Sequence, residues 1–320
     1  MTDHPTITVV VPTYRRPAQL RACLEGLAGQ EVAPLQVVVA RRPDDEASGQ
    51  VLATAPLELT VVDAPPGGVL AAMGAGLAAS QGAVIAFCDD DAVPRPEWIA
   101  RLGSAFGADV VGVGGRDVLH EPDGSLRPTS LTEDVGRIGT FGRLTGNHHR
   151  GRGPARDVEV LKGVNCAYRR AALALPTGLR GEGAQVHFEV AIGLRLQRFG
   201  RLRYDPSIVV DHQPAPRFDH DARDAASAAA VFDSAFNLTL ALSARSSGLV
   251  WRHVLYATVL GDRAQPGVLR AAAALFDPRD HTTAGRLLPA LRGAWAGARA
   301  AHRGVLRFVT SDGRVEANRG

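Results

Sequence analysis

The chain has 320 residues, of which 45% are hydrophobic and 22% are charged. This balance is typical of a globular protein with a sizeable core, and it excludes a wholly disordered chain. The formal net charge is only +3, so charge alone does not indicate a nucleic-acid-binding protein. An anionic substrate and an anionic membrane surface suit this small excess equally well. The length predicts one large domain or two modest ones.

The cysteines and the chain start bear on the compartment. Cys23, Cys88 and Cys166 are far apart and form no CxxC pair, so neither a disulfide framework nor a zinc knuckle is indicated. The first residues, MTDHPTITVVVPTYRR, lack the pattern of a signal peptide. The sequence contains no run of about 18 uninterrupted apolar residues, so no transmembrane helix is expected. We therefore expect a cytoplasmic protein.

The first third of the chain alternates strand-like and helix-like segments. Buried strands of a parallel sheet are predicted by the apolar, β-branched runs at 6–11, 35–40, 57–64, 83–88 and 109–115. Three helices are predicted from apolar residues at helical spacing: one that begins at Pro17, one over 68–81 and one over 96–106. Strand–helix–strand repetition predicts an α/β fold with right-handed crossovers.

The remainder is less regular. Residues 116–157 are rich in Gly, Arg and Pro and predict a long connection or an active-site lid. Further segments are predicted as a strand at 158–171, a helix at 187–200, and a strand and turn at 201–212. From about residue 219 onward the pattern is helical and rich in arginine. We expect a sheet-containing domain over 1–215 and a helical extension over 216–320.

Three adjacent aspartates, Asp89, Asp90 and Asp91, directly follow the apolar run at 83–88. Ligands of open α/β sheets bind beyond the carboxyl ends of the strands. Adjacent carboxylates repel one another, and in extended chain Asp89 and Asp91 can face the same way. Carboxylates together with substrate phosphates commonly hold Mg²⁺ or Mn²⁺. The cluster therefore predicts a metal–phosphate site; the alternative that Asp91 only caps a helix stays open.

Five segments, in this order, resemble family 2 glycosyltransferases of the GT-A fold. They are VVVPTYRRPAQLRACLEGL, PPGGVLAAMGAGLAASQG, VIAFCDDDAVPRPEW, LKGVNCAYRR and FEVAIGLRLQRFGRLRYDPSIVVDH. The resemblance spans residues 6–213 and implies a Rossmann-like, mostly parallel central sheet flanked by helices. The segments GEGAQVHFE and DHQPAPRFD resemble a bacterial subgroup that builds polysaccharides or glycosylated secondary metabolites.

The resemblance implies roles for the acidic cluster and the strand-end histidine. Asp91 matches the aspartate that binds the metal, Mn²⁺ or Mg²⁺, and Asp89 the one that contacts the ribose or the metal shell. Asp90 falls on the variable position between them. His212 matches a histidine that reaches the metal or the diphosphate, although a simple hydrogen-bonded pair with Asp211 stays open.

Several further residues are implied to bind the nucleotide sugar. The loop that holds the base and ribose is matched by Pro12, Thr13, Tyr14 and Arg15. After the second strand, where the family often has an aspartate, Asp44 or Asp45 is a candidate for the base contact and Arg42 for the diphosphate. A solvated charged loop is the alternative there. Contacts near the sugar are expected from Lys162, the only lysine, and Asn165, whereas His148 and His149 are expected at the surface.

The general base implied by the resemblance is Glu189, where the family usually has a Glu-Asp pair and this chain has Phe188-Glu189. Glu182, in the segment GLRGEG, is the rival candidate. The implied reaction is inverting transfer from a nucleotide sugar, most simply a UDP-sugar, to a glycan, lipid-linked or small-molecule acceptor. A sugar nucleotidyltransferase and a non-catalytic sugar-nucleotide-binding homologue are the alternatives.

The C-terminal helices leave two interpretations open. An arginine-rich surface pair resting on anionic lipid at the inner face of the membrane is one. A helical cap packed on the catalytic domain, or a homodimer interface, is the other.

Overall fold

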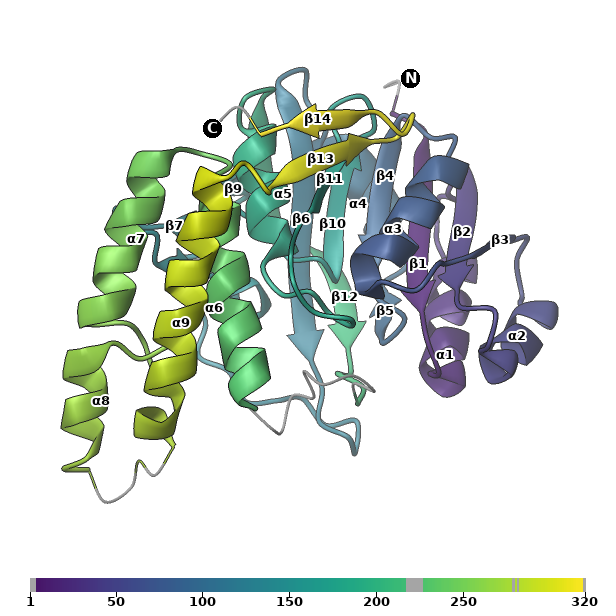
Figure 1. The fold of residues 1–320 in the computed structure, drawn as a ribbon. Helices are drawn as coiled ribbons and strands as arrows, with labels where there is room; N and C mark the ends of the chain where they lie inside the picture. Colours follow the sequence, from purple (N-terminus) through teal and green to yellow (C-terminus); the bar gives the residue numbers. More distant parts are fainter. Residues whose placement is uncertain (1–3, 217–226, 278–279, 281, 319–320) are drawn as a thin grey trace.

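The computed structural model describes residues 4–216, 227–277, 280 and 282–318. Its centre is a mixed, mostly parallel sheet with helices on both faces (Figure 1). The strands of its main path, in spatial order, are β3 (Thr60–Asp63), β2 (Gln36–Arg41), β1 (Ile7–Thr13), β4 (Val84–Cys88), β10 (Asn165–Arg169), β6 (Val110–Leu119), β12 (Arg201–His212) and β5 (Ala92–Pro94). A short strand, β9 (Arg156–Val158), pairs with β12 off this path.

Parallel pairing joins β3, β2, β1 and β4, and also joins β6 to β12. Strand β10 runs antiparallel between β4 and β6. The sheet is therefore of the α/β type expected from the sequence. Strands β1, β4 and β12 end at one edge of the sheet; the acidic cluster directly follows β4, and His212 is the last residue of β12.

Two apolar clusters cover the two faces of the sheet. Alternate residues of β1 serve different clusters, because Val9 and Val11 face one side and Val10 the other. One face is covered by α1 (Pro17–Ala28) and α4 (Trp98–Ala105), and the other by α3 (Gly68–Ala79) and α5 (Phe188–Leu196). Helix α3 lies very close to β1, since a Cβ at Gly76 would stand 2.3 Å from Val10.

The C-terminal part adds a third cluster against α5. The helices of the C-terminal part are α6 (Ala228–Leu242), α7 (Ser247–Val259), α8 (Val268–Ala274) and α9 (Thr283–His302). Phe236 of α6, Ala298 of α9 and Val190 of α5 belong to one buried cluster. The helical cap expected from the sequence is thus packed on the sheet-containing part. In the described part of the chain no helix has the length and apolar character needed to cross a bilayer.

The structure corrects the sequence predictions in two places. The segment after the second strand is not only a charged loop, because helix α2 (Glu46–Ala53) begins there and Asp45 caps it. The chain does not end in helix: β13 (Arg307–Thr310) and β14 (Val315–Ala317) form a hairpin. Strand β13 pairs with β11 (Ala174–Thr177), so the C-terminal hairpin packs back on the part of the chain that holds the central sheet (Figure 1).

Two expected irregular regions are also more ordered than predicted. The connection at 116–157 holds short pieces of structure: β7 (Arg137–Ile138), β8 (Leu144–Thr145), the 3₁₀ helix η1 (His148–Arg150) and β9. The expected strand and turn at 201–212 is one strand, β12, with a register shift between Asp205 and Val209. The proline at 206 cannot donate a ladder hydrogen bond, which fits an irregularity at that point.

Candidate active site

A cavity of about 600 Å³ lies at the edge of the sheet where β1, β4 and β12 end. It collects residues that are far apart in the sequence, as expected for the carboxyl ends of strands in an α/β sheet. The expected site residues that line it are Pro12, Thr13, Tyr14, Arg42, Asp89, Asp90, Asp91, Lys162, Glu182, Glu189 and His212. Arg15, Asp44 and Asn165 are not among its lining residues.

The side chain of Asp90 binds residues at the end of β1 and in the loop that follows it. Its carboxylate accepts a hydrogen bond from Thr13 Oγ1 at 2.8 Å and pairs with Arg16 Nη1 at 2.8 Å. Only 2% of Asp90 is exposed. Burial raises the pKa of Asp90 to about 6, even though the guanidinium of Arg16 opposes the rise. The middle aspartate therefore ties the acidic cluster to the loop that carries Tyr14.

Asp91 and His212 face each other across the floor of the cavity, with 3.3 Å between Asp91 Oδ1 and His212 Nε2. Both atoms are buried, and apart from this contact neither has a hydrogen-bond partner in the described part of the chain. The other carboxylate oxygen of Asp91 accepts from the backbone N–H of Ala215 at 2.8 Å. One acidic oxygen and one imidazole nitrogen are thus aimed at the same point.

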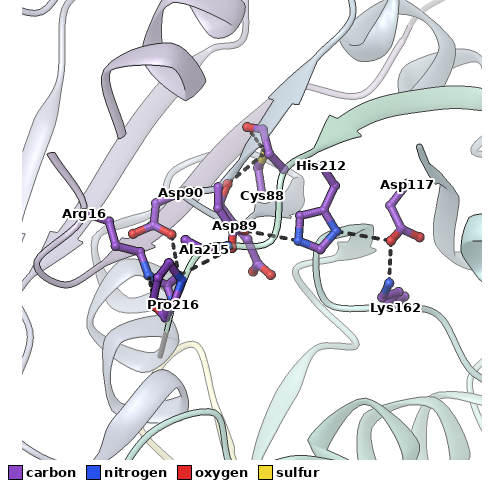
Figure 2. A network of polar contacts seen from close by, with 11 residues as sticks. Arg16, Cys88, Asp89, Asp90, Asp117, Lys162, His212, Ala215 and Pro216 are labelled. Atoms are coloured by element: carbon purple, nitrogen blue, oxygen red, sulfur yellow. Dashed lines mark hydrogen bonds and ion pairs between the residues drawn. The ribbon is translucent and has the colours of Figure 1, made fainter. Parts of the chain in front are cut away.

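The partner of His212 is Asp117, a residue that the sequence analysis did not select. His212 Nδ1 lies 3.3 Å from Asp117 Oδ2, and Lys162 Nζ pairs with the same oxygen. Figure 2 shows the resulting line of contacts, with Arg16 and Asp90 at one end and Asp117 and Lys162 at the other. Asp117 lies in the segment GVGGRD of β6, and no signal in the sequence marks it as a site residue.

The alternative of a simple Asp211–His212 pair is wrong. Successive residues of a strand face opposite sides. Asp211 accordingly binds Arg95 at 2.9 Å and His120 at 2.9 Å, away from His212. His212 instead turns toward Asp117 and Asp91, inside the cavity.

The protonation states of His212 and Asp117 follow from the geometry of their contacts. Burial lowers the pKa of His212, but its contacts with Asp117 and Asp91 outweigh burial, and the pKa is raised overall. Asp117 is buried too, yet His212 and Lys162 lower its pKa to about 2. An imidazole that donates from Nδ1 to Asp117 directs Nε2 at the carboxylate of Asp91. Two acceptors this close need a proton or a cation between them.

These residues fit a divalent cation as two protein ligands. No group of at least three His, Cys, Asp or Glu side chains arranged to hold a metal occurs within the described ranges. The remaining ligands would have to be phosphate oxygens and water, which is how Mg²⁺ and similar ions are usually bound beside substrates. Asp89 lies beside this pair, and burial, together with the carboxylate of Asp91, raises its pKa to about 7, so its charged form is disfavoured while no cation is present. A cation at this point would favour the charged carboxylates and offset the repulsion between Asp89 and Asp91.

The loop after β1 is shaped by the segment that follows β2. Arg15 has a left-handed backbone with φ of 55°, and its N–H donates to the carboxylate of Asp45. The guanidinium of Arg42 lies 4.3 Å from the ring centre of Tyr14, and Tyr14 Oη donates to Asp44 at 3.3 Å. Asp44 and Arg15 thus support Tyr14 at the rim, whereas Tyr14 and Arg42 line the cavity itself.

Asn165 lies beneath the site, in the core. Its side chain accepts from Trp98 Nε1 at 2.9 Å and donates to the carbonyls of Arg116 and Ile208 at 3.1 and 3.0 Å. Asn165 is fully buried. These contacts tie β10 to the register shift of β12, so its amide supports the sheet under the cavity.

Glu189 lies in the first turn of α5, next to Gly163. The turn before it is tight, since His187 has φ of 73°. The helix N-terminus favours a carboxylate at this position. Glu182 lines the same cavity but is exposed, on the loop at 178–187.

The loop at 178–187 is held by α6. The buried side chain of Asn237 accepts from the N–H of Arg180 at 2.7 Å. Its amide donates to the carbonyls of Arg180 and Val186 at 2.9 and 3.1 Å. Arg180 also pairs with Asp233 at 2.7 Å. The C-terminal part of the chain therefore shapes one wall of the cavity, a role that the division at residue 215 did not anticipate.

The expectation of a surface His148-His149 pair is wrong for His148. His148 is 4% exposed, and its Nε2 lies 2.8 Å from the carbonyl of Val160. Burial lowers its pKa to about 4. The neutral ring packs against Tyr204 and lines the cavity.

Residues 4–226 match the family described as "Glycosyltransferase like family 2". Glycosyltransferase AglE of Haloferax volcanii is 27% identical over 128 residues, which are 38% of this chain and 42% of that relative's length. The chain thus matches less than half of that relative.

Solved structures share the fold at low sequence identity. The mannosyltransferase PcManGT of Pyrobaculum calidifontis, in complex with GDP-Man and Mn²⁺, has a TM-score of 0.51 and 18% identity, over 95% of this chain and 88% of that one. GalNAc-T7 with UDP, GalNAc and Mn²⁺ has a TM-score of 0.56 and 12% identity, over 78% and 52%. Residues 1–349 of S. aureus TarS have a TM-score of 0.53 and 14% identity, over 98% and 99%.

Proposed function

The chain belongs to the glycosyltransferase-like family 2, and from this premise we propose that it is an inverting transferase. It moves a sugar from a nucleotide sugar to an acceptor hydroxyl, with a divalent cation and a carboxylate base. The observation that carries the proposal is the single cavity that contains the Asp91–His212 pair and Glu189 together.

The donor end of the reaction is assigned to the acidic cluster. Asp91 and His212 would hold Mn²⁺ or Mg²⁺, and Asp89 would contribute to the metal shell or contact the ribose. A cation bound there would supply Lewis-acid neutralisation of the diphosphate. Asp90 and Arg16 keep the cluster and the loop after β1 in register through their buried pair. Lys162 and Arg42 line the cavity as cations suited to phosphate oxygens.

The acceptor end is assigned to α5. Glu189 takes the proton of the acceptor hydroxyl as it attacks, because a neutral hydroxyl is a poor nucleophile. A single displacement with one base inverts the anomeric centre and needs no covalent intermediate. Glu189 is favoured over Glu182 because it stands on a helix, where its position is better fixed than on an exposed loop.

The donor nucleotide is proposed to be uridine diphosphate, held at Pro12, Thr13 and Tyr14. Two structural neighbours, whose likeness to this chain concerns the fold alone, contain UDP in one case and GDP-Man in the other. Both nucleotides therefore belong in the first screen. The acceptor is a hydroxyl of a glycan, a lipid-linked sugar or a small molecule.

The test is turnover of nucleotide sugars with Mn²⁺, followed by release of the nucleoside diphosphate and by NMR of the product's anomeric proton. Wild-type protein should release one nucleotide and form a product of inverted configuration. Glu189→Gln should remove release while Glu182→Gln keeps most of it. Product of retained configuration, or full activity of Glu189→Gln, would contradict the proposal.

A further inference from the structure

The outer sides of α7 and α9 form an exposed face that is both apolar and cationic, away from strands β1–β3 (Figure 1). Trp251 and Leu255 lie one turn apart on α7, and Leu288 and Trp295 lie two turns apart on α9. The side chains of Trp251 and Leu255 are 52% and 59% exposed. The two tryptophan rings meet edge to face, 6.0 Å between centres, so the two helices present one continuous surface.

The inner side of α9 is already occupied, which fixes the direction of this face. Gly293 and Gly297 lie so close to α6 that an added Cβ would meet the carbonyls of Phe232 and Phe236 at 2.3 and 2.6 Å. Trp295 stands between these glycines in the sequence, on the opposite side of the helix. Trp295 therefore lies on the side of α9 that faces away from α6, where its ring meets that of Trp251.

The charge of this face has one sign. Helix α7 carries one arginine, α8 one and α9 three, and none of the three helices contains Asp or Glu. Arg292 and Arg299 alternate with Leu288 and Trp295 along the exposed side of α9. Of the nearby acids, Asp262 accepts hydrogen bonds from backbone N–H groups of its own turn, and Asp280 accepts from Thr283.

We propose that this face docks on an anionic lipid surface, with arginines at the headgroups and the tryptophans and leucines at the acyl boundary. Trp, Leu and Arg on one exposed helical side are the combination that interfacial helices use. A second copy of the chain fits the charge poorly. A two-fold interface through this face would bring two arginine-bearing surfaces together, with no acid in these helices to pair with the arginines.

The test is flotation with vesicles of phosphatidylcholine alone or mixed with phosphatidylglycerol. The chain should float only with the mixed vesicles and be released by salt, because surface charge is screened. An arginine near an anionic surface is worth on the order of fivefold in partition, so Arg292→Glu with Arg299→Glu should weaken binding by at least roughly 25-fold. The matched control, Arg21→Glu with Arg101→Glu, reverses two exposed charges on α1 and α4 and should bind as wild type.

Tryptophan quenching by brominated lipid gives a second readout. Trp251 and Trp295 should be quenched, whereas a Trp251→Phe, Trp295→Phe variant keeps only Trp98, which is 1% exposed and should not respond. Absence of flotation, or equal loss in both charge-reversed variants, would overturn the proposal. So would a dimer in sedimentation that shields Trp295 from a soluble quencher.

Discussion

The two ends of the cavity are built in different ways. At the proposed donor end, Asp90, Asp91 and Asp117 each pair with a residue of a distant strand or loop. The separations are 2.8 Å for Asp90–Arg16 and 3.3 Å for the contacts of His212 with Asp91 and with Asp117. At the proposed acceptor end, Glu182 lies on an exposed loop whose contacts include those of the buried amide of Asn237 and of Asp233, both from α6. The donor chemistry is thus fixed within the sheet, whereas the acceptor wall depends on the C-terminal part.

The strongest test of this contrast is Asp91→Asn. The change leaves an oxygen for the N–H of Ala215 but removes the charge that faces His212. A metal's Lewis-acid contribution is worth several kcal/mol, so kcat/KM should fall by at least about 10³-fold. Steady-state release of the nucleoside diphosphate at saturating Mn²⁺ measures it. Activity within about tenfold of wild type would contradict the donor-end assignment.

Glu189→Gln tests the acceptor end alone. Loss of a general base typically costs 10²- to 10⁴-fold, and kcat should fall by about that amount. Donor binding should be unchanged, because Glu189 is assigned no contact with the nucleotide. Titration of the nucleotide with Mn²⁺ by calorimetry separates the two effects. Glu182→Gln is the matched control, with an expected change in kcat below about tenfold.

Asp117→Asn probes how the donor end is supported. The amide cannot neutralise Lys162 or orient His212 as a carboxylate does. Partners that orient a metal-binding histidine are worth about 10- to 100-fold in metal affinity, and we expect a loss in that range. Mn²⁺ binding followed by electron paramagnetic resonance reports this without turnover. An unchanged affinity would show that Asp117 serves only the fold.

Asn237→Ala is the smallest of these changes and is aimed at the wall beyond the sheet. It removes the hydrogen bonds that hold Arg180 and Val186, so the loop at 178–187 should loosen. We expect kcat for transfer to fall by about tenfold, since loop placement orients the acceptor. Mn²⁺–nucleotide affinity should stay at the wild-type value. Equal losses of donor affinity and transfer would instead indicate general destabilisation, and a melting curve distinguishes that case.

The sequence was most informative where the pattern is local. Buried strands form apolar runs in the sequence, and the rule that ligands bind at the carboxyl ends of strands predicts a site at Asp89 to Asp91, which line the cavity. The helical cap and the α/β sheet were likewise predictable. Helix α2 was missed because its apolar residues are few and its start depends on the Asp45 cap.

The sequence was least informative where two distant segments meet. Asp117 could not be selected, because its importance comes from the parallel pairing of β6 with β12, which brings it beside His212. Asn237 lies in an ordinary apolar helix, and only its contact with the loop at 178–187 gives it a role. His148 looked solvent-exposed within an irregular stretch, yet Val160 and Tyr204 enclose it. The C-terminal hairpin was not predicted, because its two strands are only four and three residues long and follow an arginine-rich helical segment.

The most direct measurement is thermal unfolding with UDP or GDP, with and without Mn²⁺, on wild type, Asp91→Asn and Asp90→Asn. We predict a metal-dependent rise in Tm for wild type, because ligand that binds only the folded state stabilises it. Asp90→Asn should start from a lower Tm, having lost its buried pair with Arg16, and still show the rise. Asp91→Asn should show none, and a full metal-dependent rise in that variant would contradict the metal site.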